Sequence, residues 1–418
     1  MTITLNKKIA YLGCLGVIGI ISTEFGIIGI LPQIAEYYDI NIGTAGYLLS
    51  GFALAIALTG PFMVLFASKF DKKKVMMWAL GLFLISNALS IFSPPFWLLM
   101  VLRILPTILH PAFFSMAIAA ATKDTDEKTQ MQLTSIIIGG IALAQVTIIP
   151  ITTFVASIYT WQLTYVIQGF VILLTLVVIY KYLPAMPNKE MKSFKDQLSI
   201  LVRPRFIAGI ALTLFLITAW FSSYSYFADY LSKAKSLSTQ EISYMLLLFG
   251  VMGVISNFAA GRLLGKHMFW TTLFFITGTF LLPFAFEYVG SSIISIGMVV
   301  AFWGIMYGPC FLIAIGYMVS AAPDAKEFAN SLQTSFGNLG VSIGTATGGW
   351  FINHYGIQIT PWVGVGFGAL ALMVILWRAY LDSALKRINQ EQMIKLDDNT
   401  NYRAIITVNK AAKTALRS

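Results

Sequence analysis

Residues 30–55 read ILPQIAEYYDINIGTAGYLLSGFALA, and residues 227–252 read FADYLSKAKSLSTQEISYMLLLFGVM. The two stretches align without a gap at an offset of 197 residues, and at the same offset Lys69 lies over Lys266. In each stretch a polar segment leads into an apolar run. The chain therefore contains two similar halves that follow one another in the same orientation.

The composition around these stretches excludes a soluble domain. The chain has 418 residues, of which 57% are hydrophobic and 11% are charged, with a mean hydropathy of +0.78. About a quarter of the residues in an ordinary soluble domain are charged. Apolar runs of about twenty residues recur, and a helix of that length crosses a hydrocarbon core of about 30 Å. These runs are predicted to be transmembrane helices.

We expect an all-α membrane protein with twelve transmembrane helices in two six-helix bundles. The N-terminal bundle is predicted over 1–183, a cytoplasmic linker over 184–205, the C-terminal bundle over 206–381 and a cytoplasmic tail over 382–418. The approximate spans are 9–32, 44–67, 75–93, 96–121, 133–157, 162–183, 206–231, 242–264, 268–288, 291–320, 329–353 and 361–381. Kinks are expected near Pro61, Pro106, Pro150, Pro283 and Pro309.

The distribution of basic residues predicts the orientation. Of 28 Lys and Arg residues, 25 fall in segments that are cytoplasmic if the N-terminus is inside, and only Lys233 and Lys235 fall outside. Such a bias predicts that both termini are cytoplasmic. The net charge of +10 is then explained by orientation and by attraction to anionic membrane lipids, rather than by nucleic-acid binding.

Several other features are expected to be absent. The first apolar run is too long for a cleavable signal peptide and lacks a small-residue cleavage site. Cys14 and Cys310 both lie within predicted spans, so we expect no disulfide, no metal site and no cofactor. A phosphate-binding loop is missing, which argues against an ATP-driven pump.

Three further stretches carry a family resemblance: EFGIIGILPQIA from Glu24, RILPTILHPAFF from Arg103 and GNLGVSIGTATGGW from Gly337. They resemble the drug and metabolite:proton antiporter branch of the major facilitator superfamily, particularly its bacterial sugar-efflux and purine-efflux members. The resemblance covers about residues 9–385 and implies the major facilitator fold. It also implies a monomer in the bacterial inner membrane that exports a sugar, a nucleoside or purine, or a drug in exchange for protons.

The chain departs from the family in two motifs. The loop after the second span usually reads like G-x-x-x-D-R-x-G-R-K, but here it reads VLFASKFDKKK. Lys69, Lys72 and Lys73 keep the positive charge, whereas the gate carboxylate is missing from its place and Asp71 is the nearest acid. In the fifth span the antiporter motif is reduced to TIIPITT around Pro150. An uncoupled uniporter or substrate exchanger is therefore the alternative to proton antiport.

Glu24, Arg103 and His110 are the ionisable residues deep within predicted spans. Because a charge in the membrane interior is costly, each is a candidate for proton coupling. Glu24 and Arg103 lie at similar depth and are expected to pair, and His110 follows Arg103 by seven residues, about two helical turns. A permanent structural ion pair and a packing histidine are the alternatives.

Candidate substrate-binding residues lie mainly in the second half. Trp220, Tyr224 and Tyr226 alternate with serines, a chemistry suited to a ring-shaped or amphipathic ligand, although aromatic residues also anchor helices at membrane interfaces. Asn257 and Asn338 are polar residues within spans, and hydrogen bonding between helices explains them equally well.

Gly340, Gly344 and Gly348 form a stripe at four-residue spacing, which permits close helix packing and sliding between helices. The alternative from another class is a membrane-embedded lipid-modifying enzyme. Such an enzyme would need clustered acids or a nucleophile with its base, and the loops offer only scattered acids such as Asp124 and Asp126. We therefore expect a transporter and not an enzyme.

Overall fold

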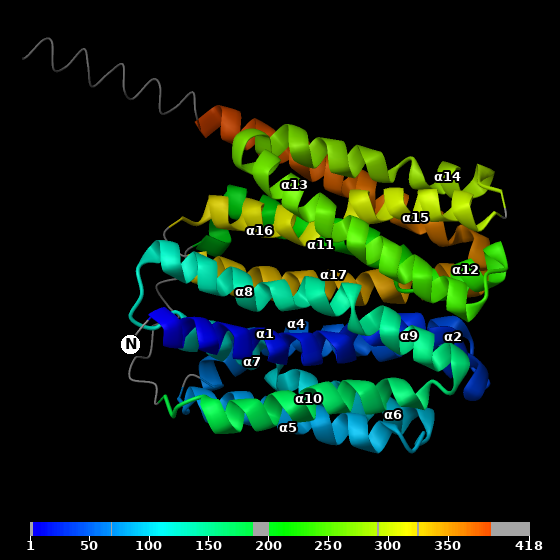
Figure 1. Ribbon diagram of the computed structural model, residues 1–418. Coiled ribbons are helices and arrows are strands. Elements are labelled where there is room, and N and C mark those ends of the chain that lie inside the picture. The colour runs from blue at the N-terminus through cyan, green and yellow to red at the C-terminus, as the bar shows by residue number, and fades with distance from the viewer. Residues whose placement is uncertain (1–2, 68, 187–199, 291, 324–325, 386–418) are drawn as a thin grey trace, which may run out of the picture.

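The computed structural model describes residues 3–67, 69–186, 200–290, 292–323 and 326–385, and the regular elements within these ranges are helices (Figure 1). The central part of the predicted linker, 187–199, and the tail from residue 386 lie outside the described residues. The boundaries predicted for the linker and the tail therefore stay predictions.

Seventeen α-helices and three 3-10 turns carry labels in chain order, and a further helix spans residues 360–385. The first half comprises α1 (Ile3–Phe25), η1 (Gly26–Gly29), α2 (Leu31–Tyr37), α3 (Ile42–Ala45), α4 (Tyr47–Ala67), α5 (Lys72–Ser90), α6 (Phe96–Ile104), η2 (Leu105–Leu109), α7 (His110–Ala121), α8 (Glu127–Val146), α9 (Ile148–Ile158) and α10 (Gln162–Tyr182). The second half comprises α11 (Pro204–Tyr224), α12 (Phe227–Lys235), α13 (Thr239–Thr279), α14 (Leu282–Tyr288), α15 (Ile293–Tyr307), α16 (Cys310–Ala321), α17 (Lys326–Tyr355) and η4 (Ile357–Ile359).

The described residues contain nine stretches that are long and apolar enough to cross a membrane. One of them, Thr239–Tyr288, holds two crossings, because α13 breaks at His267 (φ −140°, ψ 61°). The helices α5 and α17 also run the length of the bundle (Figure 1) but contain more polar residues. With these the described residues form twelve crossings in two six-helix bundles, which confirms the predicted fold class.

The two halves lie side by side, with α4 packed along α17 and α9 packed against α13. In Figure 1 the start of α1 and the end of the helix over residues 360–385 lie at the same end of the molecule, as an even number of crossings requires. The short helices α2, α12 and α14 lie at the opposite end (Figure 1). By the predicted orientation, that opposite end is external.

Most of the expected kinks coincide with helix breaks. Pro106 lies within η2, Pro150 follows the break between α8 and α9, Pro283 is at the start of α14, and Pro309 precedes α16. Proline removes a backbone donor and clashes with the preceding turn, which explains these breaks. Around position 61, in contrast, α4 runs on as one helix.

Arg378 is one of the 25 basic residues that the sequence assigns to cytoplasmic segments, but its side chain is buried, with 2% exposure. Its Nη1 atom donates to the backbone oxygen of Arg205 at 2.8 Å, its Nη2 atom donates to Ser320 Oγ at 3.1 Å, and its Nε atom donates to Asp382 Oδ1 at 3.1 Å. Asp382 also pairs with Arg205 Nε at 2.7 Å. These contacts hold the last helix to α11 and α16.

Candidate functional site

The first helix ends inside the bundle. α1 stops at Phe25 and the 3-10 turn η1 follows, with all four residues of the turn buried. The last four carbonyls of an α-helix have no partner within the helix, and they carry a partial negative charge. The backbone oxygens of Thr23 and Glu24 belong to this group, so the break creates acceptors in the protein interior.

Glycine at both ends of η1 allows neighbouring side chains to approach closely. A Cβ atom at Gly26 would collide with the side-chain amide of Gln168, and one at Gly29 would collide with the hydroxyl of Thr153. The sequence GIIG thus permits both the tight turn and its contacts with α9 and α10.

Arg103 from α6 occupies the acceptors that this break creates. Its Nη2 atom donates to the backbone oxygen of Thr23 at 3.0 Å and of Glu24 at 3.4 Å, and its Nε atom donates to the backbone oxygen of Leu48 at 3.4 Å. The guanidinium carbon lies 5.5 Å from the centre of the Phe52 ring, and the residue is 1% exposed. A fully buried cation is therefore stabilised by carbonyl dipoles and an aromatic face.

The carboxylate of Glu24 has a different partner. Its Oε2 atom lies 3.1 Å from Nε2 of His110, and the two side chains are 3% and 4% exposed. His110 begins α7 directly after η2 and stacks on Phe114 with a ring-centre distance of 4.9 Å. Its Nδ1 atom is buried without a hydrogen-bond partner among the described residues.

The three candidates predicted for proton coupling thus lie together, but their contacts differ from those expected. We expected the side-chain charges of Glu24 and Arg103 to pair. The guanidinium instead donates to backbone oxygens, and the carboxylate contacts His110. The reason is the break after Phe25, which offers Arg103 carbonyl acceptors that a continuous helix would have used internally.

Two uncharged residues complete this arrangement. Asn87 Nδ2 donates to Thr23 Oγ1 at 3.1 Å, and Gln168 Nε2 donates to the backbone oxygen of Ser22 at 2.9 Å. We call the following set the polar hub: Ser22, Thr23, Glu24, Asn87, Arg103, His110 and Gln168. Sequence reasoning missed Asn87 and Gln168 because it searched the spans for charge, although a search for buried amides would have found them.

The polar hub has hydrogen-bonding capacity to spare. Asn87 Oδ1, Gln168 Oε1 and His110 Nδ1 are all buried without a partner among the described residues. Buried polar atoms are nearly always paired in folded proteins, so such a group of unpaired atoms requires an explanation. A polar ligand or water reaching the hub would satisfy them.

Aromatic residues gather in the second half. Trp220 stacks on Tyr307 with ring centres 6.1 Å apart, and Tyr224 stacks on Phe249 at 4.7 Å. The indole nitrogen of Trp220 is buried without a partner among the described residues. Two of the predicted binding residues therefore belong to one aromatic cluster rather than to a membrane interface.

This aromatic cluster adjoins the polar hub. Phe25, the residue after Glu24, contacts Phe221 of α11 with ring centres 5.4 Å apart. The contact joins the first half to the second at the level of the helix break. The structure thus brings a buried ionisable site and an aromatic surface together where the halves meet.

The other predicted binding residues have local partners or none. Tyr226 is 1% exposed and donates from its hydroxyl to the backbone oxygen of Thr345 at 2.8 Å. Asn338 Nδ2 donates to the backbone oxygen of Thr334 within the same helix at 3.0 Å. Asn257 Oδ1 and Asn338 Oδ1 are buried without a partner in the described part of the chain. Tyr226 thus makes a packing contact, and both asparagines keep a free acceptor.

The lysines predicted to serve in gating brace the start of α5. Lys72 Nζ donates to the backbone oxygen of Ala119 at 3.2 Å, and Lys73 Nζ donates to that of Tyr180 at 2.8 Å. Burial lowers the pKa of Lys72 below its usual range. Lys69 is exposed on the preceding turn. Two of the three lysines therefore cap the ends of neighbouring helices in the same half.

Asp71 joins this loop to the chain that follows α10. Its side chain caps α5 by accepting from the Lys74 backbone nitrogen at 3.2 Å, and its Oδ2 atom accepts from the Met186 nitrogen at 2.6 Å. The Lys72 nitrogen also donates to the Met186 oxygen at 3.1 Å. Asp71 thus fixes the backbone at Met186, just after the last helix of the first half.

The glycine stripe of α17 packs within the second half. A Cβ atom would lie 3.0 Å from an α11 carbonyl oxygen at Gly340 and 2.7 Å from one at Gly344, and at Gly348 it would collide with another. The stripe therefore allows α17 to lie directly on α11, which agrees with its interpretation as a packing surface.

At the end predicted to be external, the halves are in contact. Asn353 Nδ2 donates to Asn41 Oδ1 at 3.0 Å, and a Cβ atom on Gly349 would lie 2.8 Å from Cα of Gly43. Among the described residues, this end thus carries direct contacts between α3 and α17.

Comparisons with known proteins agree with this architecture. The family model described as Major Facilitator Superfamily matches residues 13–327. The crystal structure of the nucleoside transporter NupG superposes with a TM-score of 0.73 at 10% identity, covering 89% of this chain and 99% of that chain.

Two other solved structures superpose to a similar degree. A bacterial homolog of the human lysosomal transporter Spinster, in an inward-facing and occupied conformation, superposes with a TM-score of 0.71 at 13% identity. The match covers 89% of this chain and 96% of that chain. A D-xylose-proton symporter superposes with a TM-score of 0.67 at 17% identity, and the match covers 90% of this chain and 97% of that chain. At these identities the likeness shows the fold.

Proposed function

This chain belongs to the major facilitator superfamily, and from that premise we propose that it exports a small organic molecule in exchange for protons. Family membership points to a transporter rather than an enzyme. The proposal places the protein in a bacterial inner membrane with both termini cytoplasmic, as the bias of 25 basic residues out of 28 favours.

The buried contact between Glu24 and His110 carries this proposal. A carboxylate and an imidazole 3.1 Å apart in the protein interior can share or exchange a proton, and deep ionisable residues in membrane proteins mark proton paths by default. Arg103 adds a positive charge to the same buried site. Substrate that reaches the polar hub would change these interactions and so couple binding to proton release.

The hub and the aromatic cluster favour a ring-shaped polar substrate. Unpaired carbonyl oxygens on Asn87 and Gln168 accept hydrogen bonds, and the rings around Trp220 offer a stacking surface. A nucleoside or a sugar supplies donors together with a ring. The related folds include a nucleoside transporter and a D-xylose-proton symporter, which makes both classes reasonable first probes.

Alternating access would use the interface between the two halves. In major facilitator folds the substrate lies at the interface of the halves near the midplane, and rocking exposes it to each side in turn. Contacts at the end predicted to be external, such as the one between Asn353 and Asn41, fit a state that is closed on that side. We propose that the N-terminal bundle (1–183) and the C-terminal bundle (206–381) move against one another, joined by the cytoplasmic linker (184–205) and followed by the cytoplasmic tail (382–418).

Proteoliposomes with a trapped pH-sensitive dye provide the test. Purified protein is given uridine, D-xylose or an amphenicol, and proton movement and solute accumulation are recorded with and without an imposed pH gradient. We expect one of these solutes to accumulate only while the gradient lasts and to move protons in the opposite direction. Accumulation that a protonophore leaves unchanged would contradict antiport.

The alternative is an uncoupled uniporter or substrate exchanger. It is favoured by one observation: Asp71, the acid nearest to the missing gate carboxylate, is occupied by backbone nitrogens of Lys74 and Met186. An uncoupled protein would equilibrate solute across the vesicle membrane without moving protons, so the same dye experiment distinguishes the two functions.

A further inference from the structure

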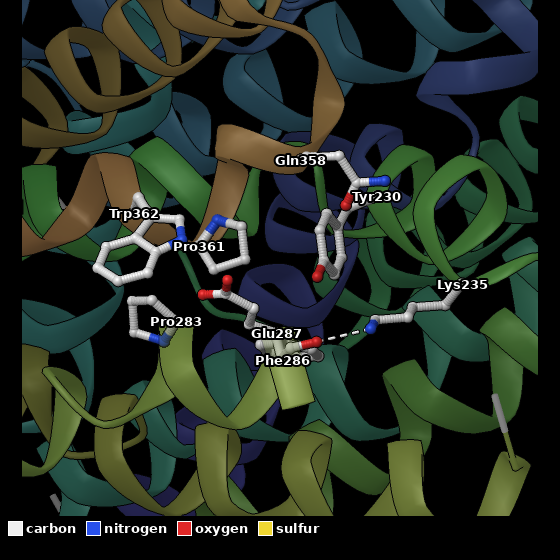
Figure 2. Close-up of a pocket in the computed structure, with 8 residues that line it drawn as sticks. All are labelled: Tyr230, Lys235, Pro283, Phe286, Glu287, Gln358, Pro361 and Trp362. Carbon is white, nitrogen blue, oxygen red and sulfur yellow. Dashed lines mark hydrogen bonds between the residues drawn. The ribbon is translucent and has the colours of Figure 1, made fainter. Parts of the chain in front are cut away.

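A cavity, separate from the polar hub, lies at the end of the second half that is predicted to be external (Figure 2). Its volume is about 260 Å³, and its walls come from α12, α14, η4 and the start of the helix over residues 360–385. Pockets for drug-sized ligands usually measure about 300–1,000 Å³. This cavity therefore suits a small molecule or part of a larger one.

The positive charge in the lining is already occupied. Lys235 Nζ donates to the backbone oxygens of Phe286 at 2.6 Å and Val289 at 3.4 Å, at the C-terminal end of α14. A lysine in this position satisfies terminal carbonyls that have no helical partner. Burial lowers the pKa of Lys235 below its usual range. Lys235 thus holds α12 to α14 and offers little to an anionic ligand.

The negative charge in the lining is not occupied. Figure 2 shows the Glu287 carboxylate directed toward Pro361, on the side of the cavity away from the Lys235 nitrogen. None of the ion pairs found among the described residues involves Glu287. Glu287 is exposed, so its carboxylate is open to dissolved ligands, and the charge that would balance it is that of a cation.

Aromatic rings flank this carboxylate. Tyr230 and Trp362 both line the cavity (Figure 2), and each ring is held by an edge contact, Tyr230 to Phe286 at 5.3 Å and Trp362 to Phe284 at 5.0 Å. Aromatic faces attract organic cations, and ammonium ligands are commonly recognised by such rings. The walls thus suit the methylene or methyl groups beside a positive nitrogen.

We propose that this cavity binds an ammonium group, with Glu287 as its counter-charge and Tyr230 and Trp362 as its aromatic walls. The group belongs either to a small free amine or to the headgroup of a membrane lipid. The site does not depend on the transport direction or on the substrate of the polar hub, because it shares no residue with the hub.

Calorimetric titration of choline into the full-length protein in a neutral maltoside detergent tests the proposal. We expect saturable binding that Glu287→Gln weakens about fivefold, as for a partly exposed ion pair, and that Trp362→Leu weakens about threefold, as for one cation–π contact. The matched control is Glu36→Gln, which removes an exposed carboxylate at the same end of the other half and should leave binding unchanged. Equal choline affinity in Glu287→Gln and wild type, or no binding to wild type, would overturn the proposal.

Nanodiscs distinguish the two sources of the ammonium group. The titration is repeated in discs of phosphatidylglycerol and in discs of phosphatidylethanolamine. A loss of the Glu287-dependent choline binding in phosphatidylethanolamine alone identifies a lipid headgroup as the occupant. Equal Glu287-dependent binding in both lipids identifies a free amine. Absence of that component in both lipids counts against the site.

Discussion

The side chains of Glu24 and His110, which are 86 residues apart in sequence, meet at 3.1 Å in the interior of the first bundle. Glu24 lies on α1 just before a helix break, and His110 begins α7 just after one. Both residues thus lie at points where the regular backbone stops, and Arg103 lies on the carbonyls that one of these breaks frees.

Glu24→Gln keeps the size and hydrogen bonding of the side chain but fixes it in a neutral form. We expect solute accumulation driven by a pH gradient to be abolished, while ligand binding and downhill exchange survive in part. Substrate-induced proton release, measured in detergent with a dye, should disappear. A Glu24→Gln protein that still concentrates solute would move the proton path elsewhere, with His110 the next candidate.

His110→Gln preserves a donor at the position of Nε2 but cannot become a cation. The carboxylate keeps a hydrogen bond, but from a donor that cannot become charged. We therefore expect gradient-driven transport to fall by roughly fivefold, the difference of about 1 kcal/mol between a charge-assisted and a neutral hydrogen bond, with substrate-induced proton release retained. Stopped-flow dye measurements on the purified protein check this. Complete loss of proton release would show instead that the imidazole is the principal carrier.

Arg103→Ala removes the group that satisfies the carbonyls of Thr23 and Glu24. We expect transport in proteoliposomes to be greatly reduced, with a stability loss of about 1.5–3 kcal/mol, as for hydrogen bonds to a charged group, seen as a lower thermal midpoint. Arg103→Lys should recover only part of the activity, because an ammonium lacks the planar fork of a guanidinium. Normal transport by Arg103→Ala would refute the role proposed for this residue.

Gly344→Ala inserts a methyl group 2.7 Å from an α11 carbonyl oxygen. We expect a loss of about 1–3 kcal/mol in stability, the usual effect of overpacking, measured as a reduced thermal midpoint. The matched control is Gly366→Ala in the last helix, where nothing lies within 4 Å of the added atom. An equal midpoint for both variants would show that α17 is not held closely on α11.

Cysteine labelling in whole cells tests the orientation. The side chain of Lys233 is 60% exposed, and Lys233→Cys should react with a membrane-impermeant maleimide added outside. Asn188→Cys, in the predicted linker, should react only after permeabilisation. The native Cys14 and Cys310 are buried, so their background labelling should be low. Labelling of position 233 only from the cytoplasm would reverse the proposed topology.

The crossings could be predicted because apolar length is a strong signal, which held even for the more polar α5 and α17. The depth of charged residues also identified Glu24, Arg103 and His110. Their contacts could not be predicted, because these depend on the 3-10 turn over Gly26–Gly29, which contains no proline.

Other parts of the site left weaker signals in the sequence. Asn87 and Gln168 are single uncharged residues in apolar spans, and their importance appears only when three helices are seen around Thr23. The cavity beside Glu287 likewise combines three segments distant in sequence. Periodicity and charge do not reveal which side chains such segments bring together.

The interior position of Glu24 also determines how the membrane voltage acts on the proposed exchange. A proton that reaches this carboxylate, 2% exposed inside the bundle, passes through part of the electric field across the bilayer. If the exported molecule is neutral, each exchanged proton carries one net charge inward. A potential of 100 mV, negative inside, then contributes about 2.3 kcal/mol per charge. Export should therefore slow when the voltage alone is reversed, even at an unchanged pH gradient.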